Sequence, residues 1–326
     1  MNEPPFEATD EGLPSTGPEL SRAHSTRAGF VTILGLPNAG KSTLLNAIIG
    51  ERLSIVSARP QTTWRRITGI HSDDQHQMVF LDTPGLLEPR DLIHEALMLE
   101  ARGALKDADI LLPVIDPTRP VQELQDRFLG GLLDGVDVPT IVAVTKVDAA
   151  PPAGVEAAVD WAQALSPKGI HKVSGETGEG VAELVAALRR ELPESPFFYP
   201  KDEVATAPVR FFVGELVRET VFERFREEIP YATFCEVEEF RDGGGRTYIQ
   251  VNIFVERPSQ KGILIGDKGA AIRDLGREAR GKIEAFLGEP VFLDLWIKVL
   301  PKWRKRRGEL RRLGLPVPKG PGPGTP

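Results

Sequence analysis

The residues that point most directly to chemistry are Gly35 to Ser42, which read Gly-Leu-Pro-Asn-Ala-Gly-Lys-Ser. They match the phosphate-binding pattern G-x-x-x-x-G-K-[ST] at every fixed position. In such a loop the backbone wraps the phosphates, Lys41 reaches the β- and γ-phosphates, and the Ser42 hydroxyl is a ligand for Mg²⁺. The loop predicts a bound nucleoside triphosphate but leaves the base open. The contacts expected from it are Asn38, Ala39, Gly40, Lys41, Ser42 and Thr43.

The segments on either side of this loop provide the setting that phosphate binding requires. Residues 30–34 are apolar and β-branched, as in a buried parallel strand. Residues 43–49 are typical of a helix that ends at Gly50, and the N-terminus of such a helix adds positive potential. This strand, loop and helix favour a phosphate site over a chance glycine-rich turn.

A second motif, Asp82-Thr-Pro-Gly85, follows the apolar residues 77–81, at the strand end where open parallel sheets bind ligands. Asp82 could hold the magnesium shell through water, and the N–H of Gly85 could detect the γ-phosphate. Between the two motifs, Thr62 and Thr63 each offer a hydroxyl to the metal, and Thr63 is slightly favoured. The predicted magnesium ligands are Ser42, Thr63 and Asp82. The residues expected to act in hydrolysis are Lys41, Ser42, Thr63 and Gly85.

The base is predicted by Thr145-Lys146-Val-Asp148, which follows a probable strand at residues 140–144. A carboxylate at Asp148 can accept hydrogen bonds from N1–H and the 2-amino group of guanine. Adenine offers neither donor, so it would leave the acceptor unpaired. The Lys146 stem can pack along the base, and a backbone N–H at Ser174 or Gly175 could meet guanine O6. These residues predict GTP and GDP as ligands.

The 326 residues are enough for two domains, and their sequence style changes along the chain. Residues 1–27 are rich in polar residues and proline, and we expect them to be disordered. Residues 28–192 alternate strand and helix signals, which indicates an α/β domain with a mostly parallel, doubly wound sheet. A proline-containing linker, 193–207, precedes an α+β domain with the order α-β-β-α-α-β at 208–305. Residues 306–326 are predicted to be a basic, then Pro/Gly-rich tail.

The overall charge of −7 hides a local basic segment. Between Lys298 and Arg312, eight basic residues stand against one acid, Glu309. Such a segment is typical of a phosphate-binding surface, and anionic lipids would attract the same charges in a peripheral membrane contact. The single cysteine, Cys235, excludes an intramolecular disulfide and fits a core position in a cytoplasmic protein.

The order of these motifs resembles the Ras-like P-loop GTPases, and more closely their Era branch, over residues 29–305. The most specific part is Glu227-Glu-Ile-Pro-Tyr231, with residues 255–269 and 291–299, which together resemble the type II KH domain of Era proteins. The resemblance implies a GTPase that binds the 3′ region of 16S rRNA and assists assembly of the 30S subunit. We expect a monomer.

The chain departs from that family at several positions. Thr145 stands where Era-like proteins usually have Asn, although its hydroxyl can keep a weaker tie to the phosphate loop. Gly175 replaces the usual Ala, and Trp64 replaces a common Arg. Leu86 occupies the position where many Ras-like enzymes carry a water-orienting Gln, so intrinsic hydrolysis should be slow. Asn38 matches relatives that use K⁺ near the phosphates, or is simply a turn residue.

The loop Gly266-Asp-Lys-Gly269 lies between two predicted helices, as a KH domain requires for clamping about four nucleotides of RNA backbone. Trp303, within the basic segment, is predicted to stack on RNA. The expected RNA contacts are Lys261, Gly262, Ile265, Gly266, Asp267, Lys268, Gly269, Arg273, Lys302, Trp303 and Arg304.

Three functions remain open at this point. The leading hypothesis is a slow GTP-hydrolysing switch whose nucleotide state controls rRNA binding. A second is a constitutive RNA-binding protein in which GTP is structural. A P-loop small-molecule kinase is disfavoured by the guanine motif at 145–148 and by the lack of an acceptor-binding segment.

Overall fold

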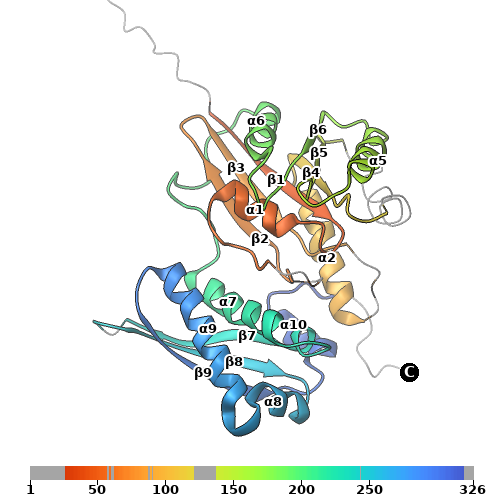
Figure 1. The fold of residues 1–326 in the computed structure, drawn as a ribbon. Coiled ribbons are helices and arrows are strands. Elements are labelled where there is room, and N and C mark those ends of the chain that lie inside the picture. The colour runs from red at the N-terminus through yellow and green to blue at the C-terminus, as the bar shows by residue number, and fades with distance from the viewer. Residues whose placement is uncertain are drawn as a thin grey trace, which may run out of the picture.

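The computed structural model describes residues 26–56, 59, 62–86, 89, 91–120, 137–242 and 244–318. The predicted N-terminal extension up to residue 25, and the end of the predicted tail from residue 319, lie outside these residues. Figure 1 shows two domains, with the helix α7 of the second domain on the side that faces the first.

The first domain is built on a six-stranded sheet with the order β2-β3-β1-β4-β5-β6. Strands β1, β3, β4, β5 and β6 run parallel, and β2 pairs antiparallel with β3. This confirms the predicted mostly parallel α/β sheet. The strands are β1 (Arg27–Gly35), β2 (Ile67–Ser72), β3 (His76–Asp82), β4 (Ile110–Ile115), β5 (Ile141–Val144) and β6 (Gly169–Lys172).

Helices cover both faces of this sheet because its central strands are apolar on both sides. Every residue of β4 and β5 is buried. One face packs against α1 and α6, whereas α2 and α5 pack on the other. The helices are α1 (Lys41–Ile49), α2 (Leu92–Lys106), α5 (Pro152–Gln163) and α6 (Val181–Glu191).

The second domain has the predicted order α-β-β-α-α-β. Its sheet has the order β7-β8-β9, in which β7 is antiparallel and β9 parallel to β8. Helices α7 and α9 pack their apolar sides against one face of the sheet. The elements are α7 (Val209–Arg224), β7 (Phe234–Arg241), β8 (Thr247–Val255), α8 (Pro258–Ile265), α9 (Ala270–Leu287) and β9 (Val291–Val299). Single 3-10 turns lie at Pro230–Ala232 and Asp267–Gly269.

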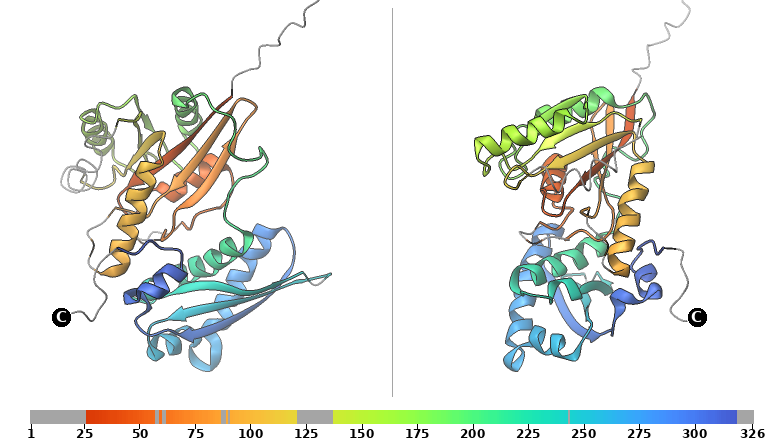
Figure 2. Two further views of the ribbon diagram at one scale, coloured as in Figure 1. Left: turned by 180° about the vertical axis from the view of Figure 1, so that it is seen from behind. Right: turned by 90° about the vertical axis from the view of Figure 1, so that its right-hand side faces the viewer.

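The chain does not leave the fold at residue 305, so the predicted tail is wrong for its first part. A 3-10 turn, Trp303–Lys305, leads into α10 (Arg307–Arg312). Leucines at 310, 313 and 315 are buried in a cluster that also contains Trp64 and residues of α2. Figure 2 shows α2 reaching from the first domain to lie beside α10. Because the segment carries so many charges, the sequence did not indicate that Leu310, Leu313 and Leu315 are buried.

Candidate functional site

Three oxygen-bearing side chains meet beside the phosphate loop. Ser42 Oγ, in the first turn of α1, donates to Asp82 Oδ2 at 2.9 Å and lies 3.1 Å from Thr63 Oγ1. Thr63 Oγ1 also donates to Asp82 Oδ2, at 3.4 Å. Asp82 is the last residue of β3, and its parallel pairing with β1 brings it to the same edge of the sheet as the loop. The structure therefore brings together the three predicted magnesium ligands.

The carboxylate of Asp82 has the character of a cation ligand. It is fully buried, and burial raises its pKa, although Lys41 and three hydroxyl donors oppose that rise. Its Oδ1 atom has no hydrogen-bond partner among the described residues. The third hydroxyl donor is Ser54, whose Oγ lies 3.1 Å from Asp82 Oδ2 and which the sequence did not reveal. Buried carboxylate and hydroxyl oxygens suit Mg²⁺, a hard cation.

Lys41 closes the phosphate loop from inside. Its Nζ donates to the carbonyls of Leu36 and Gly35, at 3.0 and 3.2 Å. Burial lowers the pKa of Lys41 to about 8, and the charge of Asp82 counteracts part of this effect. Gly85 packs against the same loop so closely that a Cβ there would lie 2.8 Å from the backbone of Pro37. No larger residue fits at Gly85 without moving the loop.

The base end of the site is tied to the phosphate loop by two side chains. Thr145 Oγ1 donates to the carbonyls of Ala39, at 2.6 Å, and Ile115, at 3.0 Å. Thr145, which stands where Era-like proteins usually have Asn, thus makes the expected hydrogen bond to the phosphate loop. Lys146 Nζ donates to the Asn38 carbonyl at 2.6 Å and to Asp116 Oδ2 at 2.7 Å.

Asp116 is a site residue that sequence reasoning missed. Burial alone would raise its pKa, but hydrogen bonds from Lys146 and Thr118 lower it. Asp116 directly follows the buried strand β4, at the same sheet edge as Asp82. A carboxylate at the end of an apolar run was the signal that could have found it.

Two adjoining cavities follow this edge. One, of about 330 Å³, is lined by Lys41, Ser42, Thr63 and Gly85 at the phosphate end. The other, of about 220 Å³, is lined by Asp148, Ser174 and Gly175 at the base end. Gly40, Thr43 and Lys146 line both cavities. The arrangement can hold an elongated ligand with phosphates at one end and a base at the other. Of the predicted contacts, Ala39 and Asp82 line neither cavity.

Comparison with known proteins identifies both domains. Residues 30–146 match the family model for 50S ribosome-binding GTPases, and residues 228–304 match the model for KH domains. GTPase Era from Thermotoga maritima is 39% identical over 285 residues, which cover 86% of this chain and 95% of that protein. GTPase Era from Geobacter metallireducens is 40% identical over 291 residues, which cover 88% and 97%. The chain belongs to the GTPase Era family. It is a GTP hydrolase that binds guanine nucleotides and carries an RNA-binding KH domain.

Solved Era structures have the same fold. A variant of Aquifex aeolicus Era bound to GDP and AlF4⁻ matches with a TM-score of 0.81 at 34% identity, covering 89% of this chain and 99% of the other. Era in complex with MgGDPNP and nucleotides 1506–1542 of 16S ribosomal RNA matches with a TM-score of 0.82, at the same identity and coverage.

The KH loop of this Era-family GTPase lies between α8 and α9. Gly266 has φ 70°, and a Cβ there would lie 2.6 Å from the Cβ of Ala271, so only glycine fits. Asp267, Lys268 and Arg273 are exposed, and Arg273 Nη1 donates to the Lys268 carbonyl at 2.8 Å. Three further predicted contacts belong to α8, where Gly262 is exposed and Lys261 and Ile265 are half-buried. The loop and its flanks thus form one surface, with Gly269 at its end.

The prediction that Trp303 stacks on RNA is wrong. Its side chain is 0% exposed, and its Nε1 donates to the Ala232 carbonyl at 3.0 Å. It packs against Trp64 and Phe234 instead. The guanidinium of Arg304 is engaged in an ion pair with Asp91 at 3.2 Å, whereas Lys302 is exposed. Trp303, the aromatic residue of the basic segment, therefore belongs to an apolar cluster between the domains.

In the part of the chain that the structure describes, no helix is both long and apolar enough to cross a membrane.

Proposed function

We propose that this chain is a GTP-controlled switch that binds 16S rRNA near its 3′ end through the KH domain and assists 30S subunit assembly. The observation that carries this proposal is the likeness, over 89% of the chain, to an Era structure in complex with MgGDPNP and 16S rRNA nucleotides. The cavity lined by Asp148, Ser174 and Gly175 and the loop at Asp267–Gly269 support this proposal.

In this proposal Ser42, Thr63 and Asp82 hold Mg²⁺, with Asp82 acting through water. When bound, the metal neutralises charge on the β- and γ-phosphates. Lys41 would exchange its loop carbonyls for phosphate oxygens, and the Gly85 N–H would contact the γ-phosphate. Asp148 would select guanine, and Ser174 or Gly175 would donate a backbone N–H to O6.

Hydrolysis without a partner should be slow. Leu86 is 0% exposed, and its N–H donates to the Gly35 carbonyl at 3.1 Å, so this position cannot orient the attacking water. Asn38 remains a candidate for binding K⁺, and turnover in KCl compared with NaCl would decide this. Equal rates in the two salts would leave Asn38 as a turn residue.

Thr63→Ala should raise the Mg²⁺ concentration needed for half-maximal GTP hydrolysis by about tenfold. The reason is that a polar contact with a charged group contributes about 1.5 kcal/mol or more, and alanine cannot replace the hydroxyl. Thr62→Ala is the matched control, since its neighbouring hydroxyl contacts neither Ser42 nor Asp82 among the described contacts. Magnesium titrations of single-turnover hydrolysis measure both. A larger effect at Thr62 would reverse the assignment.

Asp267→Lys should raise RNA affinity several-fold, because it replaces the acidic residue of the KH loop with a phosphate-binding charge. The slope of log affinity against log salt should steepen by about 0.7 for each phosphate newly neutralised. Asp202→Lys is the control, since this exposed residue carries the same charge change outside the KH domain. Fluorescence anisotropy with a 16S 3′-region RNA measures the slope for each variant. Equal slopes for Asp267→Lys and Asp202→Lys would mean that the RNA does not contact the KH loop.

The switch itself is tested by RNA affinity in three states, with GTP, with GDP and with a nonhydrolysable analogue. We expect the two triphosphate states to agree and to differ from GDP. Identical affinities in all three would support the constitutive RNA-binding alternative. Crosslinking to RNA in cell extract, followed by sequencing, would locate the bound region.

We further propose a cytoplasmic monomer in which the free charges of the basic segment contact rRNA. Two of its arginines are already engaged within the chain, Arg304 with Asp91 and Arg312 with Glu236. These pairs reduce the free charge that the segment offers to phosphates of either RNA or lipid, so the remaining exposed basic residues, such as Lys302, would make the contact.

A further inference from the structure

Helix α7 of the KH domain carries two adjacent charged residues that are buried, Arg218 at 1% and Glu219 at 0% exposure. Buried charges are costly unless they are paired and hydrogen-bonded. Several of their partners lie in the other domain, in the connection between α1 and β2 (described residues 50–56, 59 and 62–66). The same connection contains Thr63.

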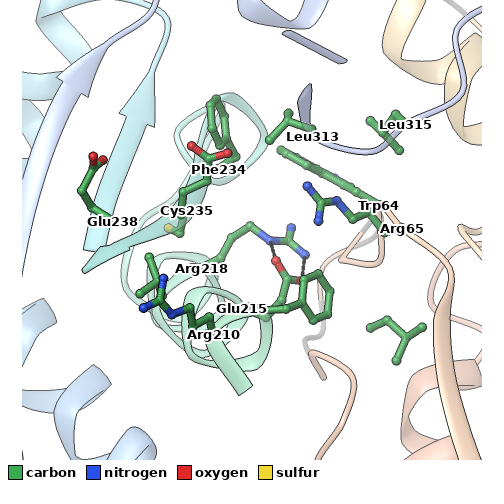
Figure 3. Close-up of a pocket in the computed structure, with 14 residues that line it drawn as sticks. Trp64, Arg65, Arg210, Glu215, Arg218, Phe234, Cys235, Glu238, Leu313 and Leu315 are labelled. Atoms are coloured by element: carbon green, nitrogen blue, oxygen red, sulfur yellow. Dashed lines mark hydrogen bonds and ion pairs between the residues drawn. The ribbon is translucent and has the colours of Figure 1, made fainter. Parts of the chain in front are cut away.

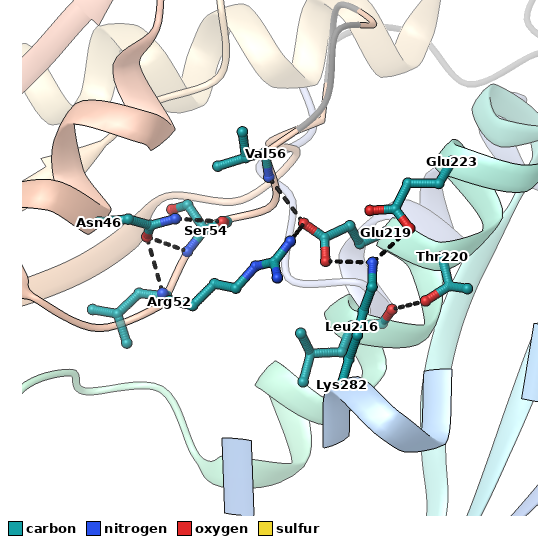
Figure 4. A network of polar contacts seen from close by, with 10 residues as sticks. Asn46, Arg52, Ser54, Val56, Leu216, Glu219, Thr220, Glu223 and Lys282 are labelled. Carbon is teal, nitrogen blue, oxygen red and sulfur yellow. Dashed lines mark hydrogen bonds and ion pairs between the residues drawn. The ribbon is translucent and has the colours of Figure 1, made fainter. Parts of the chain in front are cut away.

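Glu219 holds the beginning of this connection. Its Oε1 accepts from Arg52 Nη2 at 2.8 Å and from the backbone N–H of Val56 at 3.2 Å. Its Oε2 accepts from Lys282 of α9 at 3.0 Å. Figure 4 shows this carboxylate between the α1–β2 connection and the KH helices. One carboxylate therefore joins three segments of the chain.

Arg218 holds the end of the same connection. Its Nη2 donates to the Thr62 carbonyl, directly before Thr63. Its guanidinium is held in place by Glu215, through Nε at 2.9 Å and Nη2 at 2.6 Å. Its Cζ also lies 4.7 Å from the centre of the Trp64 ring. Figure 3 shows Arg218 between Glu215 and Trp64 at the edge of a cavity of about 400 Å³.

The two contacts lead to one carboxylate. From the Glu219 side, Val56 is two residues from Ser54, whose Oγ donates to Asp82 Oδ2 at 3.1 Å. From the Arg218 side, Thr62 adjoins Thr63, whose Oγ1 donates to the same oxygen at 3.4 Å. Asn46 of α1 also fixes the connection at Ser54, since its Oδ1 accepts from the N–H groups of Leu53 and Ser54.

We propose that Arg218 and Glu219 are positioning residues of the GTPase site, supplied by the KH domain, which set Thr63 and Ser54 against Asp82. This inference rests on the proposed switch function and gives it a physical link. In this proposal, a shift of the α1–β2 connection in one domain is coupled to a shift of α7 in the other. Helix α7 packs against β7 and α9, so it is part of the KH core.

Glu219→Gln and Arg218→Met test the proposal in the full-length protein. The first keeps the shape of the side chain but removes its charge, and the second keeps most of the stem. Glu223→Gln is the matched control, because Glu223 lies one turn further along α7 and pairs with the same Lys282 at 2.6 Å. Thermal unfolding of each variant confirms that it is folded.

Two measurements without RNA decide the outcome. We expect both test variants to raise the Mg²⁺ concentration for half-maximal hydrolysis by about five- to tenfold, as a coupling of this kind carries about 1 kcal/mol. Hydrogen exchange at the Val56 amide should speed up by about tenfold in Glu219→Gln, because its acceptor is weakened. Glu223→Gln should change neither. Faster exchange with an unchanged magnesium dependence in both folded variants would overturn the proposal, as would no change in either readout.

RNA binding separates this inference from the function on which it rests. In the wild-type chain, equal RNA affinities with GTP and GDP would refute the switch. The magnesium dependence and the exchange rate would still test whether Arg218 and Glu219 position the GTPase site. If the wild-type affinities differ, Glu219→Gln should bring their ratio closer to one, whereas Glu223→Gln should preserve it. A preserved ratio in Glu219→Gln would refute the link between the domains.

Discussion

Asp148→Asn is expected to lower GTP affinity by about a hundredfold or more, because hydrogen bonds to a charged acceptor contribute about 1.5–3 kcal/mol each and guanine supplies two donors. The Asn amide can accept only one of them and places a donor against the other. The preference for GTP over ATP should weaken accordingly. A base with a carbonyl at position 2, as in xanthine, would suit the amide and should gain affinity.

Competition of GTP, XTP and ATP against a fluorescent guanine nucleotide measures this change. Glu176→Gln is the control, since Glu176 is an exposed carboxylate that lines the same cavity. We expect it to change all three affinities equally and only slightly. If Asp148→Asn lowered the affinities for GTP, XTP and ATP by the same factor, Asp148 would stabilise the fold of the loop and would not select the base.

Trp303→Ala is expected to lower the free energy of unfolding by about 3–5 kcal/mol, the usual range for a buried Trp. The substitution would leave a cavity among Trp64, Phe234 and Leu310 and an unpaired carbonyl at Ala232. Because the cluster joins both domains, the transitions of the two domains should also separate from one another. Urea unfolding followed by circular dichroism measures both effects.

Trp296→Ala is the matched control for this result. Trp296 lies on β9, is 53% exposed, and donates from Nε1 to Asp294. Trp296→Ala should lower the free energy of unfolding by less than about 1 kcal/mol. Unchanged stability together with weaker RNA binding in Trp303→Ala would restore the stacking role that the structure rejects.

The nucleotide site was predictable because each of its parts is local in sequence. Asp82 and Thr145 each follow an apolar run, and parallel strands bring such ends to one edge. The motif alone could not choose between Thr62 and Thr63. In the structure the Thr63 hydroxyl lies beside Asp82, and the Thr62 carbonyl accepts from Arg218.

The contacts between the domains were not predictable in the same way. Arg218 and Glu219 look like ordinary polar positions of an amphipathic helix, and only tertiary packing buries them. Trp303 misled for the opposite reason, since the basic residues around it are typical of an exposed segment. Its burial depends on Phe234 and Trp64, which lie far away in the sequence.

The order of synthesis gives the Trp64–Trp303 contact a consequence for folding in the cell. Domains fold as units while the chain is made from its N-terminus. The first domain can thus form its sheet before residues 303–315 emerge, and the packing of Trp64 against Trp303 forms only afterwards. A newly made chain would pass through a period with a formed nucleotide site and an open interdomain core. Docking of α10 then completes the contact between the two domains, in addition to the contacts that α7 already makes.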